Sequence, residues 1–242
     1  MTPPATATLW QGIHDTLAGE IGAARYAPGA KLPTEAELAR RFAVNRHTVR
    51  RALAALAEAG RIHVRRGAGY FVTQARLDYA IGPRTRFSQN LADAGHTPGR
   101  TLLRLETLAA DATERRHLRL PEGARVHVTE SISQADGVPI TYSRMAFPAA
   151  RLPGLPEALR AAPSITAALA RCGIADYQRL WTRLTAERPG AMIARHLRMP
   201  ETSPVLRSES LDADADGRPV EYGTAWFCSE RVQLVIDRSS FP

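Results

Sequence analysis

Apolar residues at the start of the chain recur with the spacing of an amphipathic helix. Leu9, Ile13, Leu17 and Ile21 lie four residues apart, which places them on one face of a helix and predicts that helix over residues 9–24. The opposite face is polar, so the sequence begins with a helix that buries one side.

A second helix follows a turn at residues 26–33, which is rich in proline and glycine. Thr34 and Glu37 match a capping box, in which the threonine hydroxyl and the glutamate carboxylate each accept a hydrogen bond from the other residue's backbone N–H. This pattern predicts a helix over about residues 35–42 that buries its apolar side.

A third helix begins one short turn later. Asn45 is a favourable N-cap and Gly60 is placed to end the helix, which predicts a helix over about residues 46–59. Its apolar stripe consists of Val49, Leu53 and Leu56. Its other faces carry Arg46, His47, Arg50 and Arg51. Two helices joined by a short turn, with a cationic first turn on the second helix, are typical of a helix-turn-helix that reads the major groove of DNA.

Residues 61–73 predict a β-hairpin with a basic, glycine-rich tip, which is the form of the wing in a winged helix. A Gly-x-Gly segment alone indicates no more than a hairpin, and arginines on a helix are usually a solvated face. The density of charge favours the functional interpretation. Residues 40–66 hold eight arginines against one acid, Glu58, and a polyanion would offset their mutual repulsion.

The second half of the chain repeats itself. The segment RHLRLPE at residues 116–122 returns as RHLRMPE at residues 195–201, and the turn ADG at residues 135–137 returns at residues 215–217. The offset is 79 residues and becomes 80 after one insertion, so two copies of one unit lie in one domain. Each copy is predicted to form a short helix, a strand, an Asp-Gly hairpin turn and a returning strand.

These hairpins predict an antiparallel sheet with helices packed on it. Three further candidate strands lie at residues 101–108, 177–185 and 232–236. In the first strand of the first copy, apolar residues alternate with Thr129, Ser131 and Ser133. This row of hydroxyls is either a solvated face or the wall of a polar pocket. A short helix at residues 89–94, with Ser88 as its N-cap, precedes the sheet.

Composition fits a folded protein of one large or two small domains. The chain has 242 residues and 26.4 kDa, with 44% hydrophobic and 23% charged residues and a mean hydropathy of −0.24. No apolar run approaches the roughly 18 residues of a membrane span, and the N-terminus lacks a secretory signal. Cys172 and Cys228 are the only cysteines and have no ligand spacing, so we expect no disulfide scaffold, no metal and a cytoplasmic protein. Lys31 is the only lysine, which argues against a pyridoxal-phosphate cofactor.

Positive charge is concentrated toward the N-terminus. Of the net charge of +8, residues 1–76 contribute eleven Lys or Arg against five Asp or Glu, whereas residues 77–242 hold twenty-one against nineteen. A basic front on a near-neutral remainder predicts a polyanion-binding module attached to a second domain. We therefore expect a DNA-binding domain at residues 1–76, a linker at residues 77–86 and a second domain at residues 87–242, for which a family resemblance implies effector binding and dimerisation.

Residues 32–72, LPTEAELARRFAVNRHTVRRALAALAEAGRIHVRRGAGYFV, resemble the DNA-binding domain of GntR-type bacterial repressors. The likeness covers residues 9–73. It implies base and phosphate contacts from the start of the third helix and from the wing tip. The family's arginine early in the second helix is Ala36 here, and Arg40 or Arg41 is the expected substitute. The expected DNA-binding set is Thr34, Arg40, Asn45, Arg46, His47, Thr48, Arg50, Arg51, Arg65, Arg66 and Gly67.

The second half resembles the UTRA effector domain of the HutC subfamily, which has a chorismate-lyase-like fold. The segment RFSQNL at residues 86–91 and the overall length are most similar to the phosphonate-metabolism repressor branch. Many UTRA domains that bind phosphorylated sugars have arginines at the positions of Ser131 and Ser133 and often a tyrosine at that of Phe227, so this chain departs from that pattern. Arg86 or Arg144 is the expected replacement charge. The expected effector-binding set is Arg86, Ser88, Ser131, Ser133, Ser164, Thr166, Glu221 and Phe227.

Together these observations predict an α+β protein with an N-terminal winged helix-turn-helix and a C-terminal antiparallel-sheet domain that contains an internal duplication. We expect a transcriptional regulator, a repressor, that binds a palindromic operator in double-stranded DNA as a homodimer. The expected effector is a small molecule, either a phosphonate or a phosphorylated metabolite.

Two alternatives concern the C-terminal domain. It is an assembly or partner-docking module without a small ligand, or it is a lyase-like enzyme. The sequence holds no recognisable nucleophile–base motif, and Ser131 lacks a G-x-S-x-G context. His117 and His196 occupy equivalent positions of the repeat, which favours a shared packing role. Since a fold does not carry a function with it, we expect no enzyme.

Overall fold

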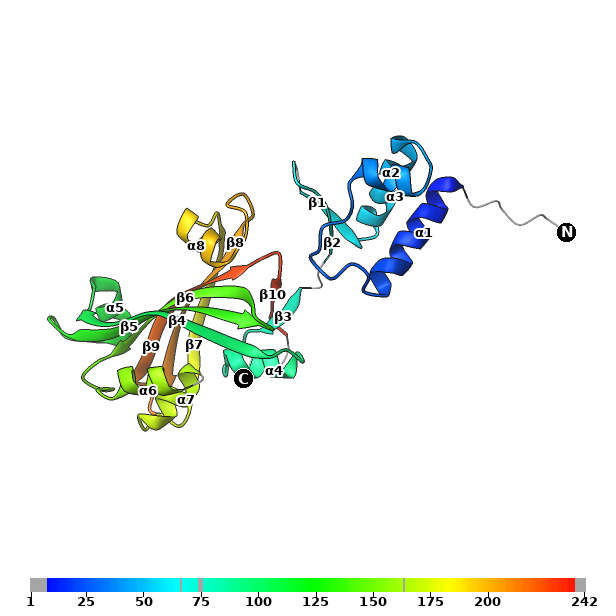
Figure 1. Ribbon diagram of the computed structural model, residues 1–242. Coiled ribbons are helices and arrows are strands. Elements are labelled where there is room, and N and C mark those ends of the chain that lie inside the picture. Colours follow the sequence, from blue (N-terminus) through cyan, green and yellow to red (C-terminus); the bar gives the residue numbers. More distant parts are fainter. Residues whose placement is uncertain (1–7, 66, 74–75, 163, 238–242) are drawn as a thin grey trace. The chain divides into compact units, whose positions relative to one another are not determined.

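The chain divides into two compact units, Met1–Ala75 and Arg76–Pro242, which are described separately (Figure 1). The computed structural model describes residues 8–65, 67–73, 76–162 and 164–237. Helices and a small hairpin make up the first unit, whereas a large antiparallel sheet dominates the second.

The first unit packs three helices against each other and against a hairpin. Its elements are α1 (Leu9–Gly22), α2 (Glu35–Arg41), α3 (Arg46–Glu58), β1 (Ile62–Arg65) and β2 (Gly69–Val72). Leu17 of α1, Leu38 of α2 and Leu53 of α3 are fully buried in one core. The helix stripes predicted from the apolar spacing therefore meet in the centre of this unit.

Local capping sets the helix boundaries. The Thr34 hydroxyl accepts a hydrogen bond from the Glu37 N–H (3.3 Å), and the Glu37 carboxylate accepts one from the Thr34 N–H (2.7 Å), which confirms the capping box. Asn45 Oδ1 accepts from the Thr48 N–H at 2.9 Å and caps α3. Gly60, just past α3, has a φ of +68°, a left-handed conformation that ends a helix with little strain in glycine.

The second unit is built on a six-stranded antiparallel sheet. The strand order is β4-β5-β6-β9-β8-β7, and a separate two-stranded sheet pairs β3 with β10. The strands are β3 (Leu77–Ala80), β4 (Pro98–Ala109), β5 (Arg125–Ala135), β6 (Val138–Pro148), β7 (Tyr177–Glu187), β8 (Val205–Asp214), β9 (Pro219–Cys228) and β10 (Val232–Val235). The helices are α4 (Phe87–Asp93), α5 (Ala112–Leu118), α6 (Leu155–Ala161), α7 (Ile165–Arg171) and α8 (Ala191–His196).

The sheet displays the sequence duplication directly. Strands β4, β5 and β6 form one half, and β7, β8 and β9 form the other in mirror order, so that the halves join along the β6–β9 pair. Each half contains one predicted Asp-Gly hairpin, at Asp136 and Asp216. The repeat therefore builds one continuous sheet with a common core.

The two faces of the sheet differ. Helices α5 and α8 cover one face, where Leu118 and Leu197 are buried against β-strand side chains of both halves. His117 stacks on Tyr222 and His196 stacks on Tyr142, with ring centroids 4.7 and 5.4 Å apart. The equivalent histidines thus share a packing role, as the repeat predicts. Helices α4 and α7 lie over the other face and leave a cavity there.

Three sequence-based expectations about this unit are wrong. Residues 77–86 are not a free linker, because Leu77–Ala80 forms β3 and pairs in parallel with β10. For the same reason the strand predicted at residues 232–236 lies outside the antiparallel sheet. Ser88 is not the cap of α4, because the helix begins at Phe87 with Arg86 in the N-cap position. Strand pairing between distant segments, which local signals do not encode, decides the first two points.

Candidate functional sites

The first turn of α3 presents cationic side chains to solvent. Arg46, His47 and Arg50 are exposed, whereas Val49 and Leu53 of the same helix are fully buried. The buried stripe fixes the rotation of α3 about its axis, and its N-terminal turn therefore faces outward. Such a turn is the part of a recognition helix that contacts base edges in the major groove.

Arg50 is oriented by a network that links three elements. Its guanidinium donates to both carboxylate oxygens of Glu35 in α2, from Nε at 3.0 Å and from Nη2 at 2.7 Å. The Tyr70 hydroxyl of β2 donates to the same carboxylate at 3.1 Å. The Arg50 guanidinium holds the pKa of Glu35 below its usual range. Bidentate pairing fixes the plane of the guanidinium at the molecular surface, and nothing in the sequence pattern predicted this contact.

Other predicted DNA-binding residues have different surroundings. The Thr34 and Thr48 hydroxyls take part in the caps of α2 and α3. Arg51 lies over the Trp10 ring of α1, with its Cζ 4.6 Å from the ring centroid. Arg40 is exposed on α2.

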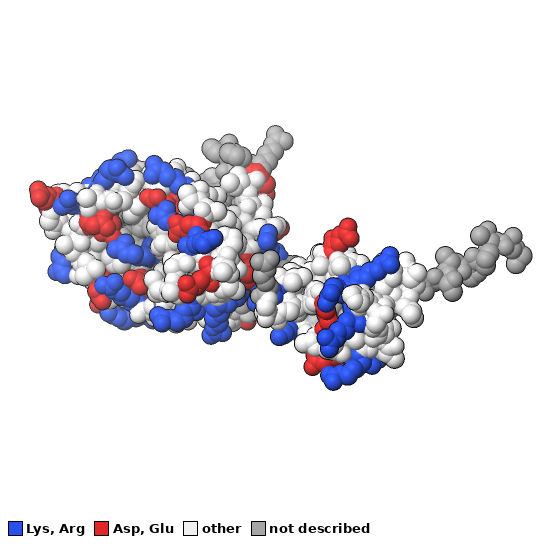
Figure 2. All heavy atoms as spheres, turned by 90° about the horizontal axis from the view of Figure 1, so that it is seen from above, with Lys and Arg blue, Asp and Glu red and all other residues white. Residues whose placement is uncertain are grey.

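The tip of the wing carries two more predicted residues. Arg65 lies over the Phe71 ring at 4.5 Å, and Gly67 is exposed in the turn with a φ of +77°. Arg66 lies outside the described residues. Figure 2 shows Lys and Arg side chains gathered on one side of the first unit, with a few acidic side chains among them. This surface has the charge that a phosphate backbone attracts.

The second unit contains a cavity of about 370 Å³, the size of a small-molecule site. Seven of the eight predicted effector residues line it, namely Ser88, Ser131, Ser133, Ser164, Thr166, Glu221 and Phe227. They come from α4, β5, the start of α7 and β9, so residues more than a hundred positions apart meet in one place.

The hydroxyl row on β5 is a wall of this cavity and not a solvated face. Ser131 and Ser133 are 2% and 9% exposed. The Ser131 hydroxyl lies 3.1 Å from that of Ser143 on the neighbouring strand β6. The structure therefore decides between the two interpretations that the alternating pattern left open.

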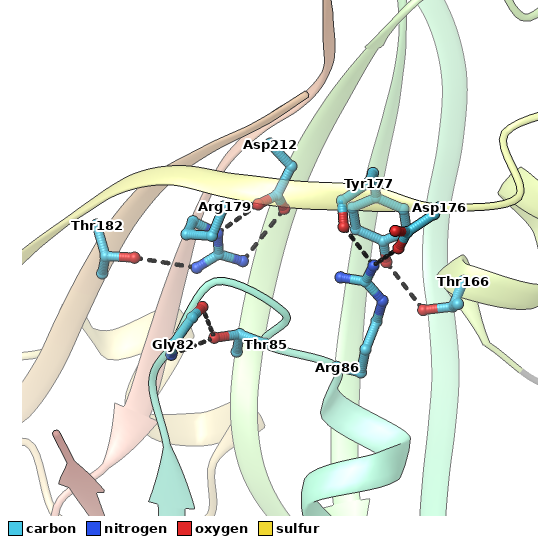
Figure 3. A network of polar contacts seen from close by, with 9 residues as sticks. All are labelled: Gly82, Thr85, Arg86, Thr166, Asp176, Tyr177, Arg179, Thr182 and Asp212. Atoms are coloured by element: carbon cyan, nitrogen blue, oxygen red, sulfur yellow. Dashed lines mark hydrogen bonds and ion pairs between the residues drawn. The ribbon is translucent and has the colours of Figure 1, made fainter. Parts of the chain in front are cut away.

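The sequence analysis missed a charged pair in the cavity wall. Arg179 of β7 donates to both carboxylate oxygens of the buried Asp212 of β8, from Nε at 2.5 Å and from Nη2 at 3.2 Å. Arg179 also donates to Thr182 at 3.1 Å (Figure 3). Arg100 of β4 lines the cavity as well. The repeat offset of 79 residues relates Arg100 to Arg179 and was the signal that would have found both.

Glu221 is an acid in an unusual environment. It is 6% exposed, and burial, together with the nearby Asp212 carboxylate, raises its pKa to about 8. The arginines around the cavity oppose this shift without cancelling it. The raised pKa favours the protonated carboxyl group of Glu221, and a cation beside it would favour release of that proton.

Arg86 is the one predicted effector residue that does not line the cavity. Its Cζ lies 3.5 Å from the centroid of the Tyr177 ring, and its guanidinium pairs with Asp176 at 3.3 Å (Figure 3). The same segment is anchored to β7, because the Pro83 carbonyl accepts from the Arg179 N–H at 2.7 Å. Thr85 of this segment does line the cavity.

The described residues contain no group of three or more His, Cys, Asp or Glu side chains that could hold a metal ion. Cys172 and Cys228 are both free. In the part of the chain that the structure describes, no helix has the length and apolar character needed to cross a membrane.

A winged helix with an exposed cationic recognition helix, joined in one chain to a domain with a polar cavity, defines a DNA-binding transcriptional regulator with an effector domain. Comparison with known proteins agrees. The gntR family of bacterial regulatory proteins matches residues 9–72, and the UTRA domain matches residues 93–233. The chain belongs to the GntR family and carries a UTRA domain of the HutC type.

Similar proteins support this assignment along most of the chain. The uncharacterized HTH-type transcriptional regulator RB1450 of Rhizobium meliloti is 35% identical over 230 residues, which cover 95% of this chain and 94% of the relative. The HTH-type transcriptional repressor PhnF of Mycolicibacterium smegmatis is 28% identical over 204 residues, covering 84% and 82%. A crystal structure of PhnF from Mycobacterium smegmatis matches with a TM-score of 0.65 at 25% identity, covering 93% of this chain and 98% of that one.

Proposed function

We propose that this regulator is a repressor that binds a palindromic operator as a homodimer and leaves it when a small molecule occupies the cavity. A two-fold dimer places two recognition helices on symmetric half-sites, which is why a palindrome is expected. The PhnF relative from M. smegmatis is named as a transcriptional repressor, which supports the direction of control.

The proposed DNA contacts follow from exposure and charge. Arg46 and His47 stand at the start of α3 without a hydrogen-bonding partner among the described residues, so they are available for base edges. Arg50 is held in place by Glu35 and reads a base or a phosphate. Arg40, Arg65, Arg66 and Gly67 contact the backbone, with Thr34, Asn45, Thr48 and Arg51 at the margin of the surface.

The effector site is the cavity. The proposed ligand contacts are Ser88, Ser131, Ser133, Ser164, Thr166, Glu221 and Phe227, with Arg86 acting through Tyr177 at its edge. An effector changes DNA binding only if it binds one arrangement of the protein more tightly than the other. Tyr79 of β3 and Thr85 both line the cavity and lie in the segment that directly follows the first unit. This segment is the proposed route of coupling.

The exposed cationic turn of α3 carries this proposal, and operator selection from random DNA tests it. The full chain is expected to enrich a palindromic sequence and to bind it with a stoichiometry of two chains per site. A metabolite panel, including phosphonates and phosphorylated compounds, is then screened for release of the selected DNA and for thermal stabilisation of the protein.

The outcomes separate the candidate roles of the second unit. Failure to enrich any sequence at low salt overturns the DNA-binding role. Enrichment without response to any metabolite, combined with stabilisation by a protein partner, assigns the second unit to assembly. Ligand-enhanced DNA binding overturns the direction of control and leaves the cavity as the effector site.

A further inference from the structure

The two halves of the second unit place equivalent arginines in one cavity but give them different partners. Arg179 of β7 lies opposite Asp212 of β8, and the two form an ion pair. Arg100 of β4, 79 residues earlier, lies opposite Ser133 of β5 in the same register. The repeat therefore provides a carboxylate for one arginine and only a hydroxyl for the other.

Arg100 is left incompletely paired as a result. Its Nη2 donates to the Leu159 carbonyl at 2.8 Å, whereas its buried Nη1 has no hydrogen-bonding partner in the described structure. Burial lowers the pKa of this guanidinium from its usual value, but an arginine remains charged at any physiological pH. A buried guanidinium with an unused N–H favours an oxyanion beside it.

Glu221 is the opposite case, an acid without a partner. It is almost completely buried and lines the cavity, and none of the hydrogen bonds or ion pairs among the described residues involves its carboxyl group. Its counterpart in the first half, at an offset of 80 residues, is Thr141, so this acid also breaks the symmetry. The charged and titratable groups that act on it across the cavity are Arg86, Arg100, Tyr177, Arg179 and Asp212, with Tyr79 beside them on β3.

The other charged groups in and beside the cavity have ion-pair partners. Arg179 pairs with Asp212, and Arg86, at the edge of the cavity, pairs with Asp176, which also pairs with Arg84. Ser131 and Ser133 add no charge. What stays unsatisfied is one cation, Arg100, and one acid, Glu221.

We propose that the effector is a small zwitterion, whose oxyanion is bound by Arg100 with the neighbouring serine hydroxyls and whose protonated amine is bound by Glu221. The inference rests on the proposed function of the cavity and names its ligand class. The oxyanion takes, beside Arg100, the place that the Asp212 carboxylate takes beside Arg179. A sugar phosphate without an amino group lacks the partner that Glu221 requires and meets only one incompletely paired guanidinium.

Proton release is the signature of this binding mode. The raised pKa of Glu221 favours its protonated form, so an ammonium group that binds as its ion-pair partner displaces that proton into the buffer. Calorimetric titration in two buffers of different ionisation enthalpy measures the number of protons released. The probes are ω-amino oxyanions (2-aminoethylphosphonate, 3-aminopropylphosphonate, β-alanine and taurine), compared with methylphosphonate, inorganic phosphate and ethanolamine, which carry only one of the two charges.

We expect at least one zwitterionic probe to bind about tenfold or more tightly than every single-charge probe, with close to one proton released per site at pH 7. The phosphonate, carboxylate and sulfonate probes distinguish the sources of the oxyanion. Glu221→Gln is expected to abolish proton release and weaken binding about tenfold or more. Glu201→Gln, an exposed carboxylate outside the cavity, is the matched control and leaves both unchanged.

Substitution of Ser133 tests whether Arg100 binds the oxyanion of the ligand. Ser133→Asp gives Arg100 the carboxylate that Arg179 already has, so it is expected to prevent binding of the zwitterion while the protein still folds and binds operator. Ser133→Asn, which has the size of the aspartate variant and no charge, also loses the hydroxyl and is expected to weaken zwitterion binding less than Ser133→Asp does. Circular dichroism and operator binding of both variants report whether the fold is intact.

The results separate this inference from the proposed function. Tight binding of a single-charge probe, or zwitterion binding without proton release, overturns the zwitterion assignment and leaves the effector cavity in place. Unchanged binding by Ser133→Asp overturns the role of Arg100. A protein that binds operator but no probe of either class also overturns the assignment, whereas loss of operator selection in the wild-type chain overturns the proposed function itself.

Discussion

The two units of this protein handle positive charge in opposite ways. In the first unit Arg46 is exposed at the start of α3, and solvent screens it until a polyanion arrives. In the second unit Arg179 is buried and bound to Asp212, because an unpaired charge inside a protein is costly. Exposed cations are thus compatible with stability before any ligand is present, whereas the unused buried N–H of the half-buried Arg100 is available to a ligand group.

Salt concentration should separate the units most strongly. Each phosphate contact releases counterions, so six or more contacts predict that operator affinity falls by about 1000-fold or more between roughly 50 and 200 mM salt. Ligand binding in the cavity should change far less, because buried charges are screened weakly. Fluorescence anisotropy with the selected operator and calorimetry with the effector measure the two responses. A flat response of operator binding contradicts the electrostatic argument.

Removing the charge of Glu221 should change how stability depends on pH. Its pKa in the folded protein is raised above the unfolded value, so its contribution is fully present below the unfolded pKa of about 4.5 and is lost as the pH rises through about 8. Glu221→Gln should therefore become more stable than the wild type as the pH increases, by up to about 1.4 kcal/mol per pH unit. Urea unfolding of the ligand-free chain at several pH values between 5 and 8 measures this trend.

The same experiment with Glu201→Gln provides the control, since this carboxylate is exposed. A difference between wild type and Glu221→Gln that stays constant across the pH range would mean that Glu221 titrates normally in the folded protein.

Truncation of the recognition helix should weaken DNA binding by a smaller amount. Arg46→Ala is expected to cost about 1–3 kcal/mol on the selected operator and to relax discrimination at one base pair if Arg46 reads a base. An equal loss on all sequences would identify a phosphate contact. Arg188→Ala, an exposed arginine in the second unit, is the control, and competition binding with single-base variants of the operator makes the distinction.

The smallest effect is expected at Glu35, a partly exposed acid at the surface of the first unit. Glu35→Gln removes the bidentate partner of Arg50, but exposed ion pairs contribute little to stability. The melting temperature of the first unit should fall by less than about 4 °C. Calorimetry of Glu35→Gln and of Glu221→Gln compares the same chemical change at the surface and in the cavity. A larger change in melting temperature for Glu35→Gln than for Glu221→Gln would contradict the expected difference between the two units.

Local signals explain why the first unit was predictable. The capping box of Thr34 and Glu37, the cap at Asn45 and the left-handed Gly60 all act within a few residues, so helix boundaries follow from nearby letters. The predicted helices end within two residues of the observed ones. The contact between Arg50 and Glu35 joins residues fifteen positions apart, and no local sequence pattern predicts it.

The second unit was predictable where the repeat or the family resemblance carried information. Seven of eight expected effector residues line the cavity, although hydrophobic spacing alone left the hydroxyl row of β5 open. The expected linker failed because β3 is stabilised by pairing with β10, more than 150 residues away. Arg100, Arg179 and Asp212 were missed because isolated charged residues on strands resemble a solvated face until the strands are paired.

The sequence by itself determined the helix-turn-helix, the hairpins and the duplication, because caps, turns and periodicity are interactions between near neighbours. Only the tertiary structure decided which polar residues share the cavity, since strand pairing brings β4 beside β5 and β7 beside β8. Burial then makes the partner of each charge important. Arg179 lies opposite the Asp212 carboxylate, whereas the equivalent Arg100 lies opposite the uncharged Ser133. That difference arises from one acid in one copy of the repeat, and it takes effect only where the folded sheet excludes water.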